Sequence, residues 1–331
     1  MRPLSEKALR DTDYAYAVGR IRALELKLLT KSDIDTLLSA KSAEDALRAL
    51  GDKGWDTENV TPDSFESVLT QESEKTWQII EETVPEPDQF NLLKYKYDFH
   101  NLKVALKSIM LRSDNDDYFI NSGTCDPAVL KKTVSQKDFK SVPEHLRDAA
   151  EECYTVLLET GDGQLCDIII DKAALEHTVK SGEKSGGFMK GLARLMCATA
   201  DIKIALRGCR TSKNLGFFER SLAACDGLDI ERMARAAASG ENDLLDYLGT
   251  TDYSECVGYI EKSALEFEKW CDNIIIEYVR SAKMTALGIS PIVAYILARE
   301  AEIKAVRIIV SAKHNIVSQD VIKERLRETY V

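Results

Sequence analysis

Apolar residues recur along this chain at the spacing of one face of an α-helix, three or four positions apart. One such stripe lies near the N-terminus and comprises Ala17, Ile21, Leu24 and Leu28. A second lies near the other end of the chain and comprises Ile292, Ile296, Ile303, Val306 and Val310. Arg299 interrupts the second stripe where a further apolar residue would fall. Both stripes predict helices that turn an apolar face toward a core.

Prolines lie where helices are expected to begin. Three pairs place a capping side chain before a proline at the first helical position: Thr61-Pro62, Asp126-Pro127 and Ser290-Pro291. Ser42 begins a further capping pattern, and Ser141 stands three residues before Glu144, the spacing of a capping box. No proline occurs between Pro143 and Pro291. Because an interior proline breaks a helix, the pattern predicts an all-α chain, and no segment predicts a strand.

A local pattern occurs three times, about one hundred positions apart. Each copy has a polar amide or acid, then an aliphatic residue, a lysine, and small or aliphatic residues. The copies are residues 101–107, 201–207 and 302–307. A second pattern, in residues 32–50 and 228–248, precedes the first and third copies, and its middle counterpart near 134–146 is weaker. Such repetition indicates repeated structural units.

These landmarks divide the chain into three helical repeat domains, each long enough to enclose a small core. The predicted domains are residues 1–113, 114–215 and 216–331. The breaks fall at 113–123, where an acidic run begins at Asp114, and at 213–216.

The repeated polar positions have two interpretations. Lys103, Lys203 and Lys304 can extend from helix edges toward solvent, as lysines beside apolar stripes commonly do. Alternatively, the polar residue two positions before each lysine fastens equivalent helices across the repeats. In the third copy Arg299 precedes Glu302 by three positions, the spacing of an ion pair on one helix face. The candidate structural residues are Asn101, Lys103, Asp201, Lys203, Arg299, Glu302 and Lys304.

Composition narrows the function classes. Hydrophobic residues make up 44% and charged residues 30% of the chain, with only 17 glycines and 7 prolines, which fits a helical globular protein. The net charge of -11 argues against a nucleic-acid-binding surface and favours basic protein partners. No apolar run is long enough to cross a bilayer, and the N-terminus lacks the apolar segment of a signal peptide. We therefore expect a cytoplasmic protein without direct membrane insertion.

No motif predicts chemistry. The eight cysteines lack a CxxC spacing and are expected to be buried, inert thiols. Gly186 and Gly191 have the spacing of a phosphate-binding loop, but Leu192 and Ala193 follow where lysine and serine or threonine are needed. The acidic run at 114–117 lacks the glycine of a calcium loop. The four histidines are far apart in sequence. We predict no catalytic residue, no cofactor and no metal ion.

Three segments together carry a family resemblance. They are residues 14–25 (YAYAVGRIRALE), 97–103 (YDFHNLK) and 299–304 (REAEIK). In order and over essentially the whole chain, the sequence resembles the C subunit of V-type or A-type ATP synthases, which is related to the d subunit of the eukaryotic vacuolar proton pump. The middle copy departs from the third because it lacks the arginine and carries Asp201 after Ala198. An ion pair like that of Arg299 with Glu302 is therefore not expected there.

The resemblance implies an all-helical, non-catalytic subunit with three similar domains arranged as a funnel about a pseudo-threefold axis. It further implies one copy in the central stalk of a rotary ATPase, peripheral at the cytoplasmic face of the membrane. Its expected partners are the central shaft subunits and the membrane proteolipid ring, and its expected role is to couple them for ATP-linked proton or sodium transport. The alternative is a stand-alone helical-repeat scaffold that binds peptides or proteins on a concave surface.

Overall fold

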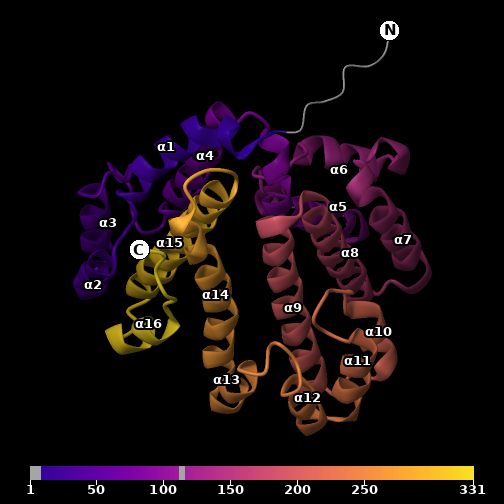
Figure 1. Cartoon of the computed structure of the whole chain (residues 1–331). Coiled ribbons are helices and arrows are strands. Elements are labelled where there is room, and N and C mark those ends of the chain that lie inside the picture. The colour runs from indigo at the N-terminus through magenta and orange to yellow at the C-terminus, as the bar shows by residue number, and fades with distance from the viewer. Residues whose placement is uncertain (1–8, 112–115) are drawn as a thin grey trace. The chain divides into compact units, whose positions relative to one another are not determined.

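The computed structural model describes residues 9–111 and 116–331, and over these residues it contains helices and turns but no strand (Figure 1). The all-α prediction is therefore confirmed. Residues 1–8 and part of the predicted break at 113–123, including Asp114, lie outside the described residues. The chain divides into two compact units, which are described separately. Unit 1 comprises residues 1–87 and 263–331, and unit 2 comprises residues 88–262.

Unit 1 joins the two ends of the chain. Its helices are α1 (Ala15–Glu25), α2 (Lys31–Ser39), α3 (Ala43–Gly51), α4 (Glu66–Thr83), α14 (Ala264–Arg280), α15 (Ser290–His314) and α16 (Gln319–Arg325), with short 3-10 turns at Asp11–Tyr14 and Ser281–Met284. The central helix is α15, which packs against α1, α3, α4, α14 and α16. Its apolar stripe is buried as the sequence predicts, and Ile292, Ile296 and Ile309 are fully buried.

Unit 2 holds the middle of the chain. Its helices are α5 (Tyr95–Leu111), α6 (Pro127–Ser135), α7 (Glu144–Thr160), α8 (Gly163–Ser185), α9 (Gly187–Arg210), α10 (Leu215–Ser221), α11 (Ile230–Ser239), α12 (Glu241–Leu248) and α13 (Cys256–Lys262). Short 3-10 turns occupy Asp116–Tyr118 and Phe139–Ser141, and a further turn, Pro87–Leu93, leads in from unit 1. Helices α8 and α9 form a tight hairpin, which turns at Gly186 and Gly187 with φ of 70° and 46°. Such left-handed backbone favours glycine, so the hairpin gives Gly186 a structural role in place of phosphate binding.

The long helix that ends each sequence repeat packs against helices of the following one. In unit 2, α5 packs against α6, α7 and α8, and α9 packs against α10, α11 and α12. In unit 1, the last long helix, α15, packs against α1, α3 and α4 at the start of the chain. The boundaries of the three predicted domains remain a prediction. Each of these groups of helices contains the long helix that ends one sequence repeat and helices of the next repeat.

The helix caps agree only partly with the sequence. Asp126 caps α6 by accepting from the backbone N–H of Ala128 at 2.8 Å, and Ser42 caps α3. In contrast, α15 begins at Ser290 itself, so this serine lies inside the first turn and does not cap it. Helix α4 begins at Glu66, because residues 61–65 form turns ahead of it. Proline marks all three regions, but only Pro127 occupies the first helical position that the sequence predicts.

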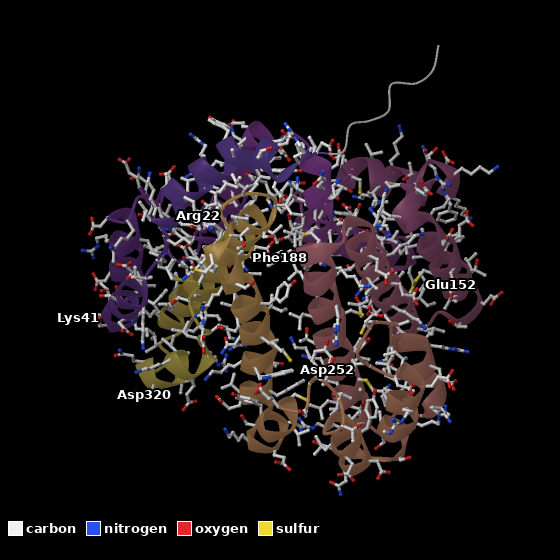
Figure 2. All side chains as sticks on the ribbon, in the orientation of Figure 1. Arg22, Lys41, Glu152, Phe188, Asp252 and Asp320 are labelled. Carbon is white, nitrogen blue, oxygen red and sulfur yellow. A yellow bond between two sulfur atoms is a disulfide. The ribbon has the colours of Figure 1, made fainter. Side chains whose placement is uncertain are left out.

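Charged side chains cover the outside of both units, and Lys41, Glu152 and Asp320 are exposed examples labelled in Figure 2. No helix in the described part of the chain combines the length and apolar character needed to span a bilayer.

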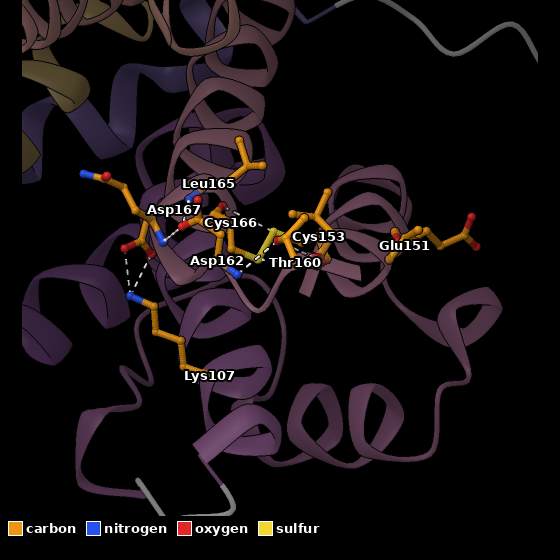
Figure 3. The surroundings of a disulfide bond; sticks show 11 residues. Lys107, Glu151, Cys153, Thr160, Asp162, Leu165, Cys166 and Asp167 are labelled. Carbon is orange, nitrogen blue, oxygen red and sulfur yellow. Dashed lines mark hydrogen bonds and ion pairs between the residues drawn. A yellow bond between two sulfur atoms is a disulfide. The ribbon is translucent and has the colours of Figure 1, made fainter. Parts of the chain in front are cut away.

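One cysteine prediction is wrong. Cys153 on α7 and Cys166 on α8 are joined in a disulfide, whereas the sequence predicts unpaired thiols (Figure 3). The chain reverses at Gly161, whose φ of 65° ends α7, so α8 folds back and brings the two Cα atoms to 5.2 Å. Two cysteines 13 residues apart on predicted helices carry no sequence sign of that reversal. The other six cysteines are free.

Candidate functional site

The three copies of the repeated motif lie on the three long helices α5, α9 and α15. Their first residues are buried: Asn101 and Asp201 are 0% exposed and Glu302 is 8% exposed. In each copy a side-chain oxygen of this residue accepts a hydrogen bond from a backbone N–H in a loop that precedes a short helix. The donors are Ile120 at 2.9 Å, Ala223 at 3.0 Å and Leu29 at 3.3 Å. We call Asn101, Asp201 and Glu302 the polar anchors.

Asn101 uses both ends of its amide. Its oxygen accepts from the backbone N–H of Ile120, and its nitrogen donates to the carbonyl of the same residue at 2.8 Å. One turn earlier on α5, the buried carboxylate of Asp98 accepts from the backbone and hydroxyl of Thr124, from Cys125, and from His145 at 3.0 Å. Burial alone would raise the pKa of Asp98, but these hydrogen bonds hold it below its ordinary value. Together they fasten the loop before α6 to α5.

Asp201 is the least satisfied anchor. One carboxylate oxygen accepts from the backbone N–H of Ala223, and the other contacts the Cys197 thiol at 3.6 Å. Burial raises the pKa of Asp201 to about 7, even though the Ala223 hydrogen bond favours the charged form. As the sequence predicts, no arginine stands one turn earlier, because that position is Ala198.

Glu302 belongs to a buried ionic group. Arg299 donates to Glu302 at 2.9 Å and to Glu72 on α4 at 2.5 Å, and all three side chains are at least 90% buried. The guanidinium also lies 5.3 Å from the ring centre of Trp55, and Lys75 pairs with the other oxygen of Glu72 at 2.8 Å. Burial raises the pKa of Glu302, and the neighbouring Arg299 opposes that rise. The group connects α15 and α4, and Glu302 adds the segment before α2.

The repeated lysines lie at helix edges. Lys103 pairs with Asp171 on α8 at 2.5 Å, and Lys304 pairs with Asp272 on α14 at 2.6 Å. Lys203 is half-buried on α9. Ion pairs this accessible contribute little stability, about 1 kcal/mol or less each. The lysines lie at helix edges, and the polar residues before them accept hydrogen bonds from loop N–H groups and not from equivalent helices of other repeats.

The structure also brings two of the four distant histidines together. The ring centres of His145 and His177 are 5.3 Å apart, and those of His177 and Tyr95 are 4.4 Å apart in a T-shaped arrangement. Burial lowers the pKa of His177 to about 4, and the nearby charges of His145 and Lys180 act in the same direction.

The Asp98–His145 pair resembles the base and orienting acid of a nucleophilic enzyme, with Cys125 beside it. However, burial and Asp98 raise the pKa of Cys125 to about 12, so its thiol stays protonated. A protonated thiol is a poor nucleophile. This cluster is therefore suited to holding the loop and not to cysteine catalysis.

Known proteins resemble this chain over most of its length. The family model described as ATP synthase (C/AC39) subunit matches residues 17–325, nearly the whole chain. The chain belongs to the ATP synthase (C/AC39) subunit family. Among its relatives, the C subunit of the V-type sodium ATPase of Enterococcus hirae is 25% identical over 94% of this chain and 97% of its own length. The C subunit of the A-type ATP synthase of Thermococcus kodakarensis is 22% identical over 96% of this chain and 91% of its own, and that of Methanocaldococcus jannaschii is 21% identical over 91% and 82%.

In this C/AC39 family member, sequence reasoning finds the Arg299–Glu302 pair but misses the partners that lie in other segments. Asp98 carries a detectable signal, because it precedes Asn101 by the same three positions that separate Arg299 from Glu302. Glu72 carries none, since 227 positions separate it from Arg299. The backbone donors cannot be predicted from residue type either, because every residue except proline supplies an N–H.

Proposed function

We propose that this chain is the non-catalytic component of the central stalk that couples the central shaft of a rotary V/A-type ATPase to its membrane proteolipid ring. In this proposal one copy lies at the cytoplasmic face of the membrane and takes part in ATP-linked proton or sodium transport. The three sequence repeats form three similar domains around a pseudo-threefold axis, as a funnel. The observation that carries the proposal is the set of polar anchors, which recurs once in each repeat of a chain in this family.

The anchors suit a part that transmits torque. Each one ties a long helix to a loop of the next group of helices through a buried hydrogen bond, so the helix cannot slide without leaving a buried polar group unpaired. That loss costs about 1–3 kcal/mol for a neutral group and about 3–5 kcal/mol for one partner of a buried ion pair. Against a typical domain stability of about 5–15 kcal/mol, these are large local barriers. Close-packed helices joined in this way resist deformation.

A candidate surface for contact with other proteins of the complex lies on α1 and the turn after it. Its exposed face carries Tyr16, Gly19, Leu26 and the basic residues Arg20 and Lys27, and it has no carboxylate, which is unusual for a chain of net charge -11. Leu26 is 87% exposed.

A second exposed apolar residue stands on the turn that follows α14. Met284 is 92% exposed, and Arg22 of α1, labelled in Figure 2, holds its turn by donating to the carbonyls of Ala282 and Thr285. Contiguous exposed apolar patches mark protein contact surfaces, and substitutions at Leu26 and Met284 test whether these residues belong to one. Leu26 in the turn after α1 and Met284 on the turn after α14 are therefore the first positions to substitute.

The test uses the assembled complex. A V/A-type complex reconstituted without this chain should hydrolyse ATP without pumping ions, and adding the full chain should restore pumping. In pull-downs at low salt, the chain should bind both the shaft subunits and detergent-solubilised ring. Added salt should weaken shaft binding because that binding is partly electrostatic, whereas salt-independent binding would point to an apolar contact. Leu26→Asp or Met284→Asp should reduce binding to the shaft subunits or to the ring. Leu158→Asp, at a 70% exposed position on α7, is the matched control and should leave both interactions unchanged.

Binding to neither partner would contradict the coupling role. Together with an elongated, arc-like shape in small-angle scattering and capture of peptides, that result would favour the helical scaffold.

A further inference from the structure

A cluster of metal-binding side chains surrounds the middle anchor. Cys197 and Asp201 lie one turn apart on α9, and Cys225 follows α10 on the loop that Asp201 holds. One ligand atom from each of the three lies within 4.8 Å of the other two. Cys197 is 0%, Asp201 0% and Cys225 9% exposed, so the cluster belongs to the interior of unit 2.

The charge of this anchor is unbalanced. The anchor of the first repeat is a neutral amide, and that of the third is a carboxylate paired with Arg299 at 2.9 Å. Asp201 is a fully buried carboxylate whose described contacts are one backbone N–H and one thiol. A buried carboxylate with so few donors is costly unless it is protonated or meets a cation. A metal ion at this point would supply the missing positive charge.

We propose that Cys197, Asp201 and Cys225 form a binding site for a zinc-like divalent cation. Two thiolates and one carboxylate are a ligand set that Zn²⁺ favours, with bonds of about 2.3 Å to sulfur and about 2.0–2.2 Å to oxygen. Ligand atoms around a tetrahedral ion of this size stand about 3.5–4 Å apart, and the present separation of 3.6 Å between the Cys197 sulfur and an Asp201 oxygen fits that spacing. Only small side-chain movements are required.

A cavity gives the ion a route and a fourth ligand. Cys225 lines a cavity of about 480 Å³ that opens to solvent, and four carboxylates also line it: Glu183, Asp226, Asp229 and Glu231. Their negative potential favours cation entry. Water from the cavity completes the coordination. On binding, the two thiol protons pass to solvent, as does the Asp201 proton where that carboxyl is protonated, and three metal–ligand bonds form.

Bound metal would join α9 to the loop before α11, the same two segments that Asp201 already connects. The ion would act as a cross-link within unit 2 and stabilise it in proportion to the logarithm of metal concentration.

The experiment uses the full chain, stripped of metal and handled under an inert atmosphere without a reductant, so that the Cys153–Cys166 disulfide stays intact. Zinc titration by calorimetry and elemental analysis should give about one ion per chain, and Co²⁺ should produce the intense thiolate-to-cobalt absorption that cysteine ligands cause. Zinc should also raise the Tm of the protein. Absence of stoichiometric binding, or cobalt binding without the thiolate band, would overturn the proposal.

Variants identify the ligands. Cys197→Ser and Cys225→Ser should each weaken zinc binding on the order of 100-fold, and both should diminish the cobalt band. Asp201→Asn should do the same to affinity while keeping the metal-free Tm, because an asparagine already serves as the anchor at Asn101. Cys209→Ser, at a free half-buried cysteine elsewhere on α9, is the matched control and should leave binding unchanged. Unaltered affinity in the Cys197 and Cys225 variants would place the ion elsewhere and refute the assignment.

Discussion

The buried ionic group on α15 predicts an unequal response to two substitutions. Replacing Arg299 with leucine should destabilise unit 1 more than replacing Glu302 with alanine. Arg299→Leu leaves two buried carboxylates, Glu72 and Glu302, that have lost the cation they share. Glu302→Ala leaves Arg299 with its second partner, Glu72, still 2.5 Å away.

The contacts set the magnitudes. Removing one partner of a buried ion pair costs about 3–5 kcal/mol, and we expect Arg299→Leu to lie at or above the upper end because it breaks two pairs at once. Glu302→Ala removes one pair and the acceptor of the Leu29 N–H, while Arg299 stays paired, so about 2–3 kcal/mol is expected. Glu302→Gln keeps an acceptor for Leu29 and should cost less than alanine.

The two variants should also differ in their pH dependence. Burial already raises the pKa of Glu302, and Arg299 opposes that rise, so loss of Arg299 raises this pKa further. A carboxyl with a raised pKa binds more protons in the folded than in the unfolded state, and its contribution therefore diminishes as pH rises. The deficit of Arg299→Leu should be largest near neutral pH and shrink toward about pH 5. Glu302→Ala lacks that carboxyl and should show no such recovery.

Tryptophan fluorescence is a selective assay for this effect. All three tryptophans, Trp55, Trp77 and Trp270, belong to unit 1, so their emission during urea unfolding follows that unit alone. A triple variant with Glu72→Met, Arg299→Met and Glu302→Gln is the control, and it should recover most of the lost stability because no buried charge is left unpaired; Lys75, which loses Glu72, is 49% exposed. Equal costs for the two single variants, or an Arg299→Leu deficit that stays constant with pH, would refute the reasoning.

Other predictions concern packing, surface charge and acid stability. Gly208→Ala on α9 should lower the Tm of unit 2 in melts followed by circular dichroism, because the new methyl group would stand 2.5 Å from a buried phenylalanine ring, at a cost of about 1–3 kcal/mol. Gly258→Ala on α13, where nothing lies within 4 Å, is the control and should be neutral or stabilising in the same melts. Lys304→Met should change the free energy of unfolding by less than about 1 kcal/mol, since this lysine is half-exposed where it pairs with Asp272, and a larger loss in urea titrations would mean that the pair is essential. The pKa of His177 falls to about 4 on folding, so the unfolded chain binds a proton at this histidine before the folded chain does. Unit 2 should therefore lose about 1–2 kcal/mol of stability, after allowance for solvent screening, as pH falls from about 6.5 to 4. His177→Gln should remove this part of the acid sensitivity in hydrogen-exchange measurements.

Helix content and the repeat follow from the sequence because both depend on local spacing. The buried positions agree closely: residues 101 and 102 and residues 201 and 202 are buried, as are 105, 106, 205 and 206. Exact helix starts follow less well. Ser290 is the first residue of α15 instead of its cap, and Ile289 stands at the cap position without a side-chain hydrogen bond. Capping patterns therefore mark the region in which a helix begins more reliably than its first residue.

The candidate site is likewise only partly predictable from the sequence. The anchors are visible because they repeat within their own helices. Apart from Arg299, their partners lie in other segments, and a backbone donor such as the N–H of Ala223 has no side-chain signature. The disulfide of Cys153 with Cys166 is equally hidden, since it depends on the reversal at Gly161. Sequence spacing predicts helical periodicity, but it does not predict which distant segments lie close together in the fold.

The three anchors show what their position requires. An amide, a carboxylate near thiols and a carboxylate paired with arginine all perform one common act, which is to accept a hydrogen bond from a loop N–H at 2.9–3.3 Å. Because a neutral amide suffices at Asn101, negative charge is not needed for that act. Arg299 balances the charge of Glu302 in the third repeat, whereas Asp201, whose pKa burial raises to about 7, is relieved either by protonation or by a cation. In the second repeat no described basic side chain donates to Asp201, and the two neighbouring cysteines are the groups through which a bound cation could balance it.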